Sequence, residues 1–264
     1  MTTGRKSIFI TGAASGIGRE TARLFAAKGW LVGAYDVNLT GLEALQAELG
    51  AENCLTGKLD VSNRAAFQAA LAGFTTATGG TLDILFNNAG IGRGGPFADQ
   101  SFEDILAVVN INFIGVLNGI HAGIQYLKAT PGSLCFTTSS SSATYGMPNL
   151  AVYSATKHAV KGLTEALAVE FHAFGVRAAD MLPGLIDTAI LPEGTSARAP
   201  TSGMFRLINP ADVAAMVWTA YHGEKLHYYV PEEIAELDKA ATLTPESVRD
   251  AMQSGTFFGN LVAP

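Results

Sequence analysis

The sequence predicts one α/β domain over residues 1–264, in which a doubly wound, mostly parallel sheet of seven strands lies between two layers of helices. Short β-branched or apolar runs alternate with helical stretches along most of the chain, as in parallel strands joined by crossover helices. A glycine-rich turn directly follows the first run. A composition with 48% hydrophobic residues and 29 glycines suits one large core with many tight turns.

Each strand is expected where an apolar run stops at a glycine or a polar residue. The predicted strands are 7–11, 31–35, 53–59, 82–87, 133–138, 176–181 and 226–230. The predicted helices are 16–28, 39–49, 63–78, 101–111, 113–129, 149–174 and 210–222, and no sharp break separates 101–111 from 113–129. Right-handed crossovers between these strands make the sheet doubly wound.

Two regions fit this rhythm poorly. Residues 186–208 contain two prolines, two glycines and several Ser and Thr residues, which predicts a mobile loop that carries substrate specificity. Residues 231–264 form a tail with two weakly helical stretches, 231–241 and 245–254. Apolar residues beside the site could line a substrate pocket or belong to the core: Tyr145, Met147, Leu185, Met204 and Phe205. Phe257 and Phe258 could cap the site or pack at a subunit contact.

Charge and composition exclude several classes of protein. The formal net charge is −6 and no run of Lys or Arg reaches three, so we expect neither nucleic acid nor an anionic membrane as a partner. Two cysteines, Cys54 and Cys135, make no disulfide framework, and the first residues are too short an apolar stretch for a signal peptide. We therefore expect a cytoplasmic protein. The five histidines do not cluster with cysteines or acids, so no metal site is expected.

The glycine turn, Gly12, Gly16 and Gly18, opens the first predicted helix, where a dinucleotide pyrophosphate can approach the backbone and the helix N-terminus. Its alternative is a purely structural turn. Asp36 ends the second predicted strand, where a carboxylate can bind the adenosine ribose and repel a 2′-phosphate. Neither Val37 nor Ser15 offers a cation for such a phosphate, so the pattern favours NAD over NADP. The alternative for Asp36 is a simple turn residue.

Tyr153 and Lys157 lie four residues apart on a predicted helix and so share a face. A phenol is a poor base at neutral pH, but a neighbouring ammonium lowers its pKa enough for acid–base chemistry. Tyr221 and Lys225 have the same spacing, but Gly223 interrupts them and no serine lies at the matching distance upstream. Ser140 lies thirteen residues before Tyr153, just after a strand.

Together these motifs resemble the short-chain dehydrogenase/reductase family. The matching stretches follow the family's order over residues 5–190: TGAASGIG (11–18), DV (60–61), NNAG (87–90), NFIG (112–115), SS (139–140), YSATK (153–157) and PGLIDT (183–188). The resemblance implies a Rossmann-type fold and four catalytic residues: Asn112, Ser140, Tyr153 and Lys157. Asn110 competes with Asn112, and Ser139, Ser141 and Ser142 compete with Ser140, but their spacings fit less well.

The resemblance also implies which residues bind the cofactor. Tyr153 would be the acid–base, Lys157 would lower its pKa and hold the nicotinamide ribose, and Asn112 would support a proton-relay water. The full set expected to contact NAD is Gly12, Ser15, Gly16, Ile17, Gly18, Asp36, Asp60, Val61, Asn88, Ala89, Gly90, Tyr153, Lys157, Pro183, Gly184, Ile186 and Thr188. We read Asn87 as a buttress of its strand.

The predicted reaction is hydride transfer between NAD and a secondary alcohol or its ketone, with a hydrophobic small molecule as substrate. The alternatives are an NADP-dependent carbonyl reductase of the same fold and a dinucleotide-binding sensor without turnover. The resemblance implies a homodimer or homotetramer formed through the helix 149–174. The family usually ends in a glycine-rich segment, whereas here the last strand runs into Pro231, which weakens the analogy with fatty-acid ketoreductases and with their tetramer contacts.

Overall fold

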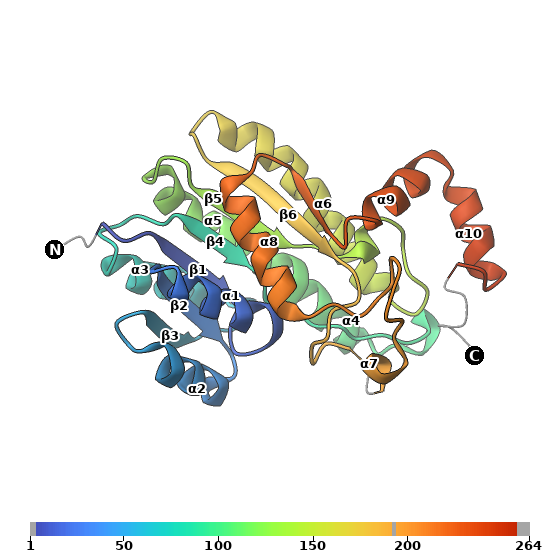
Figure 1. Cartoon of the computed structure of the whole chain (residues 1–264), viewed down its shortest axis with the longest axis horizontal. Helices are drawn as coiled ribbons and strands as arrows, with labels where there is room; N and C mark the ends of the chain where they lie inside the picture. Colours follow the sequence, from blue (N-terminus) through green and yellow to red (C-terminus); the bar gives the residue numbers. More distant parts are fainter. Residues whose placement is uncertain (1–3, 192–193, 258–264) are drawn as a thin grey trace.

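The structure is a computed structural model that describes residues 4–191 and 194–257. Phe258, residues 192–193 of the 186–208 segment and residues 258–264 of the tail therefore lie outside the described residues. The described chain forms one domain around a single sheet, with helices on both of its faces (Figure 1).

The sheet has seven parallel strands in the order β3-β2-β1-β4-β5-β6-β7. Their bounds are β1 Ser7–Thr11, β2 Leu31–Asp36, β3 Cys54–Lys58, β4 Ile84–Asn87, β5 Leu134–Thr138, β6 Arg177–Pro183 and β7 His227–Val230. The strand order reverses direction between β1 and β4. In open α/β sheets, ligands bind outside the carboxyl ends of the strands at such a switch point.

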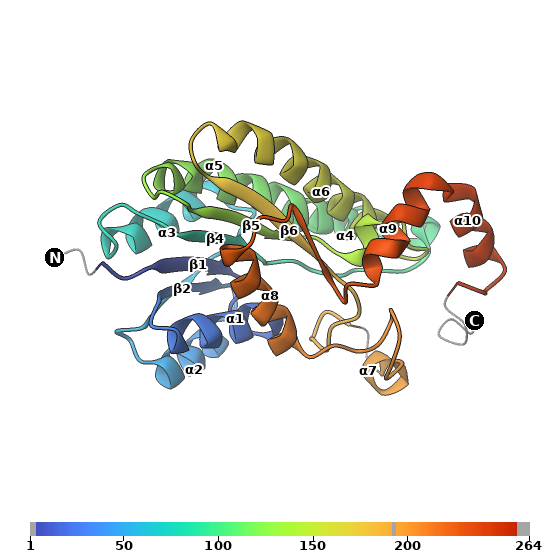
Figure 2. The ribbon, with the colours of Figure 1, turned by 45° about the horizontal axis from the view of Figure 1, so that its top comes forward.

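Helices cover the two faces of the sheet as separate layers (Figure 2). One layer holds α1 Gly16–Ala27, α2 Leu39–Leu49 and α8 Pro210–His222, and the other holds α3 Arg64–Thr76, α5 Gly115–Lys128 and α6 Ala151–His172. Strand residues alternate between the layers, since Ile8 and Ile10 pack with the first core and Phe9 with the second. Both faces are covered, which is why β1, β4 and β5 are buried along their whole length.

One continuous helical run, residues 102–128, lies in the second helix layer. Helix α4, Phe102–Val109, continues through a π-helical turn at Asn110–Ile114 into α5, which explains why the sequence shows no sharp break there. The run Phe102–Lys128 is long enough to cross a membrane, and an 18-residue window within it has a mean hydropathy of 1.7. Here α5 packs against α3, β4 and β5, as a core helix does.

The two segments that fit the rhythm poorly lie beyond the sheet's carboxyl end. In 186–208, a parallel β-bridge joins Ile186 to Ile208, and a short helix, α7 Thr195–Arg198, lies between these two residues in sequence. The tail forms α9 Ile234–Leu243 and α10 Pro245–Gln253, close to the two expected stretches, and α10 projects from the body (Figure 1). Phe257 packs on Phe205, with ring centroids 5.6 Å apart, so the tail meets the 186–208 segment.

The tail is fastened to the domain by one partly buried ion pair. Lys161 of α6 donates to both carboxylate oxygens of Asp238 on α9, at 2.7 and 2.6 Å. The Tyr229 hydroxyl of β7 donates to the same carboxylate at 2.6 Å. Three elements therefore meet at Asp238, and this contact fixes α9 against the sheet.

At the opposite, amino end of the sheet, aromatic side chains close the molecule. Phe25, Trp30, Trp218 and Tyr221 pack on one another with ring centroids 4.8–6.0 Å apart, and we call them the amino-end cluster. Lys6 donates to the Tyr221 hydroxyl at 2.6 Å, and its ammonium lies 5.6 Å from the Trp30 ring. This cluster ties β1, β2, α1 and α8 together.

Candidate active site

The glycine turn at the end of β1 forms a cradle with no space for side chains. Gly12 and Gly16 have φ of 68° and 51°, a region that glycine adopts without strain. A Cβ on Gly18 would lie 2.2 Å from the Gly12 carbonyl oxygen, so α1 approaches the turn as closely as backbone can. Ser15 makes no side-chain cap hydrogen bond, and no acid lies in the first turn of α1. The helix therefore leaves amide donors for an anion.

Asp36 reaches from the end of β2 back to the glycine turn. Its Oδ2 accepts the Ala14 N–H at 3.0 Å, and its Oδ1 accepts the Asn38 N–H at 2.9 Å. The carboxylate therefore lies beside the glycine turn. Val37 next to it is 59% exposed and leaves the outer side of the carboxylate open.

Threonines at the ends of two strands connect the turn to the segment after β4. The Thr11 hydroxyl accepts the N–H groups of Asn88 and Ala89 at 3.0 and 3.1 Å. The Asn88 side chain donates to the Thr11 carbonyl and accepts from the Thr138 hydroxyl at 3.1 Å. Thr138 belongs to none of the sequence motifs, although it ends β5 directly before one.

Asp60 and Val61, which the resemblance assigns to the adenine, follow β3. The exposed Asp60 carboxylate accepts from the N–H and hydroxyl of Ser62, at 2.9 and 2.7 Å. Val61 is buried, and its side chain fills the space where a Cβ on Gly115 would lie, 2.6 Å away. The pair thus caps the start of α5, while the Asp60 side chain faces solvent.

Asn112 is fully buried in the π-helical turn. Its Oδ1 accepts the Ile91 N–H and its Nδ2 donates to the Ile91 carbonyl, both at 2.9 Å. A Cβ on Gly90 would lie 3.3 Å from the Asn112 Oδ1 and 3.8 Å from the Lys157 Nζ. The amide therefore holds the strand-like segment after Gly90 beside Lys157, and π-helical turns often occur at such functional positions.

Tyr153, Lys157 and Ser140 meet at the carboxyl end of β5. The Lys157 ammonium is buried, donates to the Thr138 carbonyl at 2.7 Å and lies 5.6 Å from the Tyr153 ring centroid. Burial lowers the pKa of Lys157 to about 8, although the negative charge of Asp180 acts to raise it. Burial raises the pKa of Tyr153, and a hydrogen bond with Ser140 opposes that change.

The neighbouring serines have other partners. Ser139 donates its hydroxyl to the Lys157 carbonyl at 3.1 Å, and Ser140 accepts the Ser142 N–H at 3.1 Å through its own oxygen. Asn110, the competitor of Asn112, is exposed on the outside of the helical run. Of the alternatives that spacing left open, Ser140 is the serine that bonds to Tyr153 and Asn112 is the asparagine that lies beside Lys157.

Residues 183–188 complete the wall opposite the glycine turn. Gly184 donates its N–H to the Val230 carbonyl at 2.7 Å, and Ile186 is buried. A Cβ on Gly16 would lie 2.9 Å from the Cγ2 of Thr188, so this segment touches the start of α1. The structure therefore brings Pro183, Gly184, Ile186 and Thr188 to the same end of the sheet as the glycines.

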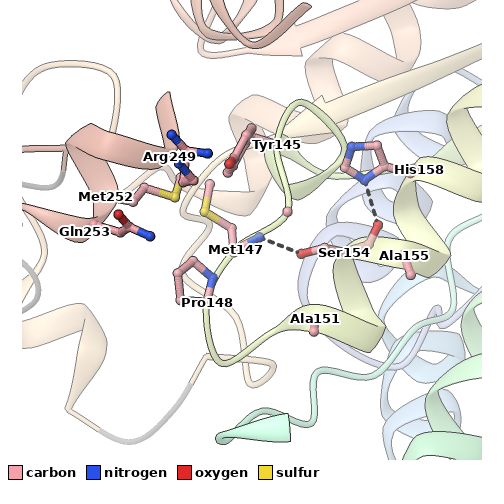
Figure 3. Close-up of a pocket in the computed structure, with 11 residues that line it drawn as sticks. Tyr145, Met147, Pro148, Ala151, Ser154, Ala155, His158, Arg249, Met252 and Gln253 are labelled. Carbon is pink, nitrogen blue, oxygen red and sulfur yellow. Dashed lines mark hydrogen bonds between the residues drawn. The ribbon is translucent and has the colours of Figure 1, made fainter. Parts of the chain in front are cut away.

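A pocket of about 690 Å³ lies next to the site, between the start of α6 and α10 (Figure 3). Tyr145, Met147 and Pro148 line it from the loop after Ser140, and Arg249 and Met252 line it from α10. Two of the expected pocket residues, Tyr145 and Met147, are among its walls, whereas Leu185, Met204 and Phe205 are not. The α6 residues that line it include Ser154 and His158, on the face next to that of Tyr153.

The second tyrosine–lysine pair has a different place. Tyr221 belongs to the amino-end cluster, and Lys225 is exposed and pairs with Glu232 at 3.7 Å. Burial raises the pKa of Cys54 and of Cys135 to about 12, so both remain neutral thiols in the core. Within residues 4–191 and 194–257, no three His, Cys, Asp or Glu side chains gather as they would around a metal ion.

The family model described as short chain dehydrogenase matches residues 6–199. The chain belongs to this family. It is 33% identical over 216 residues to cyclohexanol dehydrogenase of Acinetobacter sp. (strain SE19), which covers 80% of this chain and 86% of the relative. It is 36% identical over 190 residues to levodione reductase of Leifsonia aquatica, 70% of each chain.

Solved structures give the same fold. A 3-ketoacyl-(acyl-carrier-protein) reductase from Brucella melitensis in complex with NADH superposes with a TM-score of 0.77 at 30% identity, over 85% of this chain and 96% of its own. An alcohol dehydrogenase from Thermococcus sibiricus with 5-hydroxy-NADP has a TM-score of 0.76 at 24% identity, over 85% and 95%, and shows the fold alone. The predicted seven-stranded, doubly wound fold and the family are confirmed, and the protein is an oxidoreductase of this nicotinamide-dinucleotide-binding fold.

Proposed function

We propose that the protein is an NAD-dependent dehydrogenase that interconverts a secondary alcohol and its ketone, with Tyr153 as the acid–base. The observation that carries this proposal is the buried Lys157 ammonium, held at 2.7 Å by the Thr138 carbonyl and 5.6 Å from the Tyr153 ring. A buried ammonium costs free energy, so its retention beside a tyrosine favours a chemical role over a structural one.

The residues of the turn fit a dinucleotide. A Cβ at Gly12, Gly16 or Gly18 would meet protein atoms within 3 Å, so the turn carries no side chains there. Its bare backbone would let the pyrophosphate approach the N–H groups. Ser15 and Ile17 open α1 and would present its free amides to the phosphates. Asp36, Asp60, Val61 and the segment Asn88–Gly90 would surround the adenosine, and residues 183–188 would hold the nicotinamide amide. When bound, the nicotinamide ring supplies the hydride chemistry.

In the oxidative direction, the Tyr153 phenolate takes the proton of the substrate hydroxyl, while the Ser140 hydroxyl orients the substrate oxygen. The Lys157 ammonium stabilises the phenolate, because an opposite charge favours the ionised form. Lys157 would also hold the nicotinamide ribose. Asn112 keeps the segment after Gly90 beside Lys157, and the π-helical turn around it is where a water could relay the proton to solvent.

Asp36 supports NAD as the cofactor and oxidation as the direction. Its carboxylate lies beside the phosphate cradle, where a 2′-phosphate would meet a like charge. Lys58 is in register with Asp36 on β3 and would be the nearest strand cation once the carboxylate is removed. We therefore expect Asp36→Ala to shift the preference toward NADP by about tenfold or more, the effect of a single charge of roughly 1.4 kcal/mol.

The substrate proposed is a small hydrophobic alcohol or ketone. The apolar walls formed by Tyr145, Met147 and Met252 support it, as do the alcohol and the ketone after which the two relatives are named. We further propose a cytoplasmic homodimer or homotetramer that associates through α6. Its outer face, with the exposed Ala166 and the 78%-exposed Val169, has the small and apolar side chains that helix packing requires.

The experiment incubates purified protein with NAD and a panel of secondary alcohols that includes cyclohexanol, and follows NADH formation. Turnover with NAD and a kcat/KM at least tenfold lower with NADP support the proposal. A strong preference for NADPH with a ketone panel would replace it with the carbonyl-reductase function. NADH binding without turnover in either direction would favour a dinucleotide sensor.

A further inference from the structure

A carboxylate that the proposed chemistry does not use lies behind the site. Asp180 of β6 is fully buried in the middle of a strand whose neighbours are apolar. Ala178 packs in the core on the α6 side, whereas Ala179 and Met181 pack on the α8 side, so strand alternation turns Asp180 toward α6. A fully buried carboxylate needs a partner to offset its loss of water.

His227 of β7 is that partner for one oxygen. The two residues are opposite each other in the β6–β7 register, and the His227 Nδ1 lies 2.7 Å from the Asp180 Oδ1. The other imidazole nitrogen lies 3.4 Å from the half-exposed Glu165 on α6. The second oxygen of Asp180, Oδ2, is buried and has no hydrogen-bond partner among the described residues.

Two lysines of α6 lie in the same layer as Asp180. Lys161 is already paired with Asp238 at 2.6 Å, whereas Lys157 forms no ion pair with a carboxylate among the described residues. The Lys157 ammonium bonds to the carbonyl of Thr138, which is paired with Met181, the residue next to Asp180. Both charges therefore lie in the layer between β5–β6 and α6. The Asp180 charge favours the protonated form of Lys157 and so opposes the lowering of its pKa by burial.

We propose, resting on the role assigned to Lys157 above, that Asp180 and His227 form a buried positioning pair for the reaction. The Asp180 carboxylate is the counter-ion of the Lys157 ammonium, and the His227 imidazole holds that carboxylate ionised and in place. The pair acts through Lys157 and touches neither substrate nor cofactor.

The pKa directions agree with this arrangement. Burial raises the pKa of Asp180, and the hydrogen bond from His227 opposes that rise. Burial lowers the pKa of His227, but the bond and charge of Asp180 outweigh it, and the net direction is upward. The charges of Lys161 and Glu165 of α6 act on both members of the pair, and Asp180 acts on Lys157 of α6 and on Tyr229 of β7. Asp238 of α9 is bonded to Lys161 and Tyr229.

Tyr153 and Lys157 titrate as a coupled pair, in which the active form holds the phenolate and the ammonium together. Without the Asp180 charge, Lys157 loses its proton first and less phenolate forms at a given pH. For Asp180→Asn we expect the midpoint of Tyr153 ionisation to move up by about one pH unit and kcat at pH 8 to fall about tenfold.

The measurement is an ultraviolet difference titration of the whole protein without cofactor, in which the Tyr153 phenolate is the signal lost in the matching Tyr153→Phe variant. His227→Leu removes the donor and raises the pKa of Asp180, so it should move the Tyr153 midpoint in the same direction. His227→Asn keeps an N–H donor near the position of Nδ1 and should restore most of the shift. Asp238→Asn removes another carboxylate of the same layer, whose partner is Lys161, and should leave the midpoint unchanged.

An unchanged Tyr153 midpoint in folded Asp180→Asn and His227→Leu would overturn the pair, and His227→Leu decides alone where Asp180→Asn does not fold. A shift equal to theirs in Asp238→Asn would also overturn it, since any buried charge would then suffice. The titration needs no turnover. Failure of the wild-type protein to oxidise any alcohol would therefore count against the proposed function without deciding the pair.

Discussion

At the amino end of the sheet, large side chains close the molecule, whereas at the carboxyl end small residues and backbone leave room for a ligand. The amino-end cluster stacks aromatic rings at 4.8–6.0 Å under Lys6, and Arg5 donates to carbonyls of Gly29, Trp30 and Glu52. The carboxyl end holds three crowded glycines and the buried Lys157. The free energy gained from aromatic packing at the amino end thus offsets the free energy cost of burying polar groups at the carboxyl end.

The largest expected effect is a difference in kcat between variants of Tyr153 and Tyr221, the two tyrosines that lie four residues before a lysine. Tyr153→Phe removes the acid–base and should lower kcat by about 10²–10⁴-fold with little loss of stability. Tyr221→Phe loses the hydrogen bond from Lys6 and should cost about 1 kcal/mol of unfolding free energy with normal kcat. Steady-state kinetics and urea unfolding of both variants check this. Equal loss of kcat in the two would contradict the assignment.

A second comparison uses two helical glycines. Gly18→Ala places a Cβ 2.2 Å from the Gly12 carbonyl oxygen, so the cradle must open, and we expect kcat/KM for the cofactor to fall roughly 10²-fold. Gly73→Ala lies on the exposed side of α3 with no atom within 4 Å of the new Cβ. It should stabilise the protein by about 0.5–1 kcal/mol. Unimpaired cofactor binding by Gly18→Ala would argue against the cradle.

Removing an aromatic ring at the amino end should change stability and spare the chemistry. Trp30 is 5% exposed and contacts Phe25, Trp218 and Tyr221. Trp30→Ala should lower the unfolding free energy by about 3–5 kcal/mol, because it leaves a cavity in a packed cluster. The KM for cofactor, measured at a temperature where the variant is folded, should remain unchanged. A raised KM would show that the two ends are coupled.

The Lys157→Met substitution tests the carboxyl end of the sheet, where it should lower activity but raise stability. The folded-state pKa of Lys157, about 8, lies below the unfolded value near 10.4, so the ammonium costs the folded state free energy below pH 8. The variant should be inactive yet more stable by about 2 kcal/mol at pH 7, and the difference should shrink as pH rises from 8 to 10. Denaturant titrations at several pH values test this, and a less stable variant at pH 7 would contradict it.

Local patterns were enough to predict the strands, most helices and the glycine turn, because each depends on residues close in sequence. The predicted strand 53–59 differs from β3, Cys54–Lys58, only at its ends. The π-helical turn at Asn110–Ile114 escaped prediction, since the sequence there stays apolar and helical. The family motifs placed Ser140 and Tyr153 correctly relative to each other at the carboxyl end.

Contacts between distant strands could not be read from the sequence. Asp180 and His227 meet only because β6 and β7 pair in one particular register, and in the sequence none of the five histidines clusters with an acid. Trp30 and Trp218 likewise meet only once α8 packs on α1. Which residues share a core is therefore a property of the topology, and the chemistry behind Lys157 follows from it.

Both tryptophans of the chain belong to the amino-end cluster, with ring centroids 6.0 Å apart. Tryptophan emission therefore reports on that end alone, while the fluorescence of bound NADH would report on the other. Recording both fluorescence signals in one denaturant series would reveal whether the protein unfolds cooperatively or releases its cofactor from a partly unfolded state. The two tryptophans and bound NADH would thus serve as two optical probes, one at each end of the sheet.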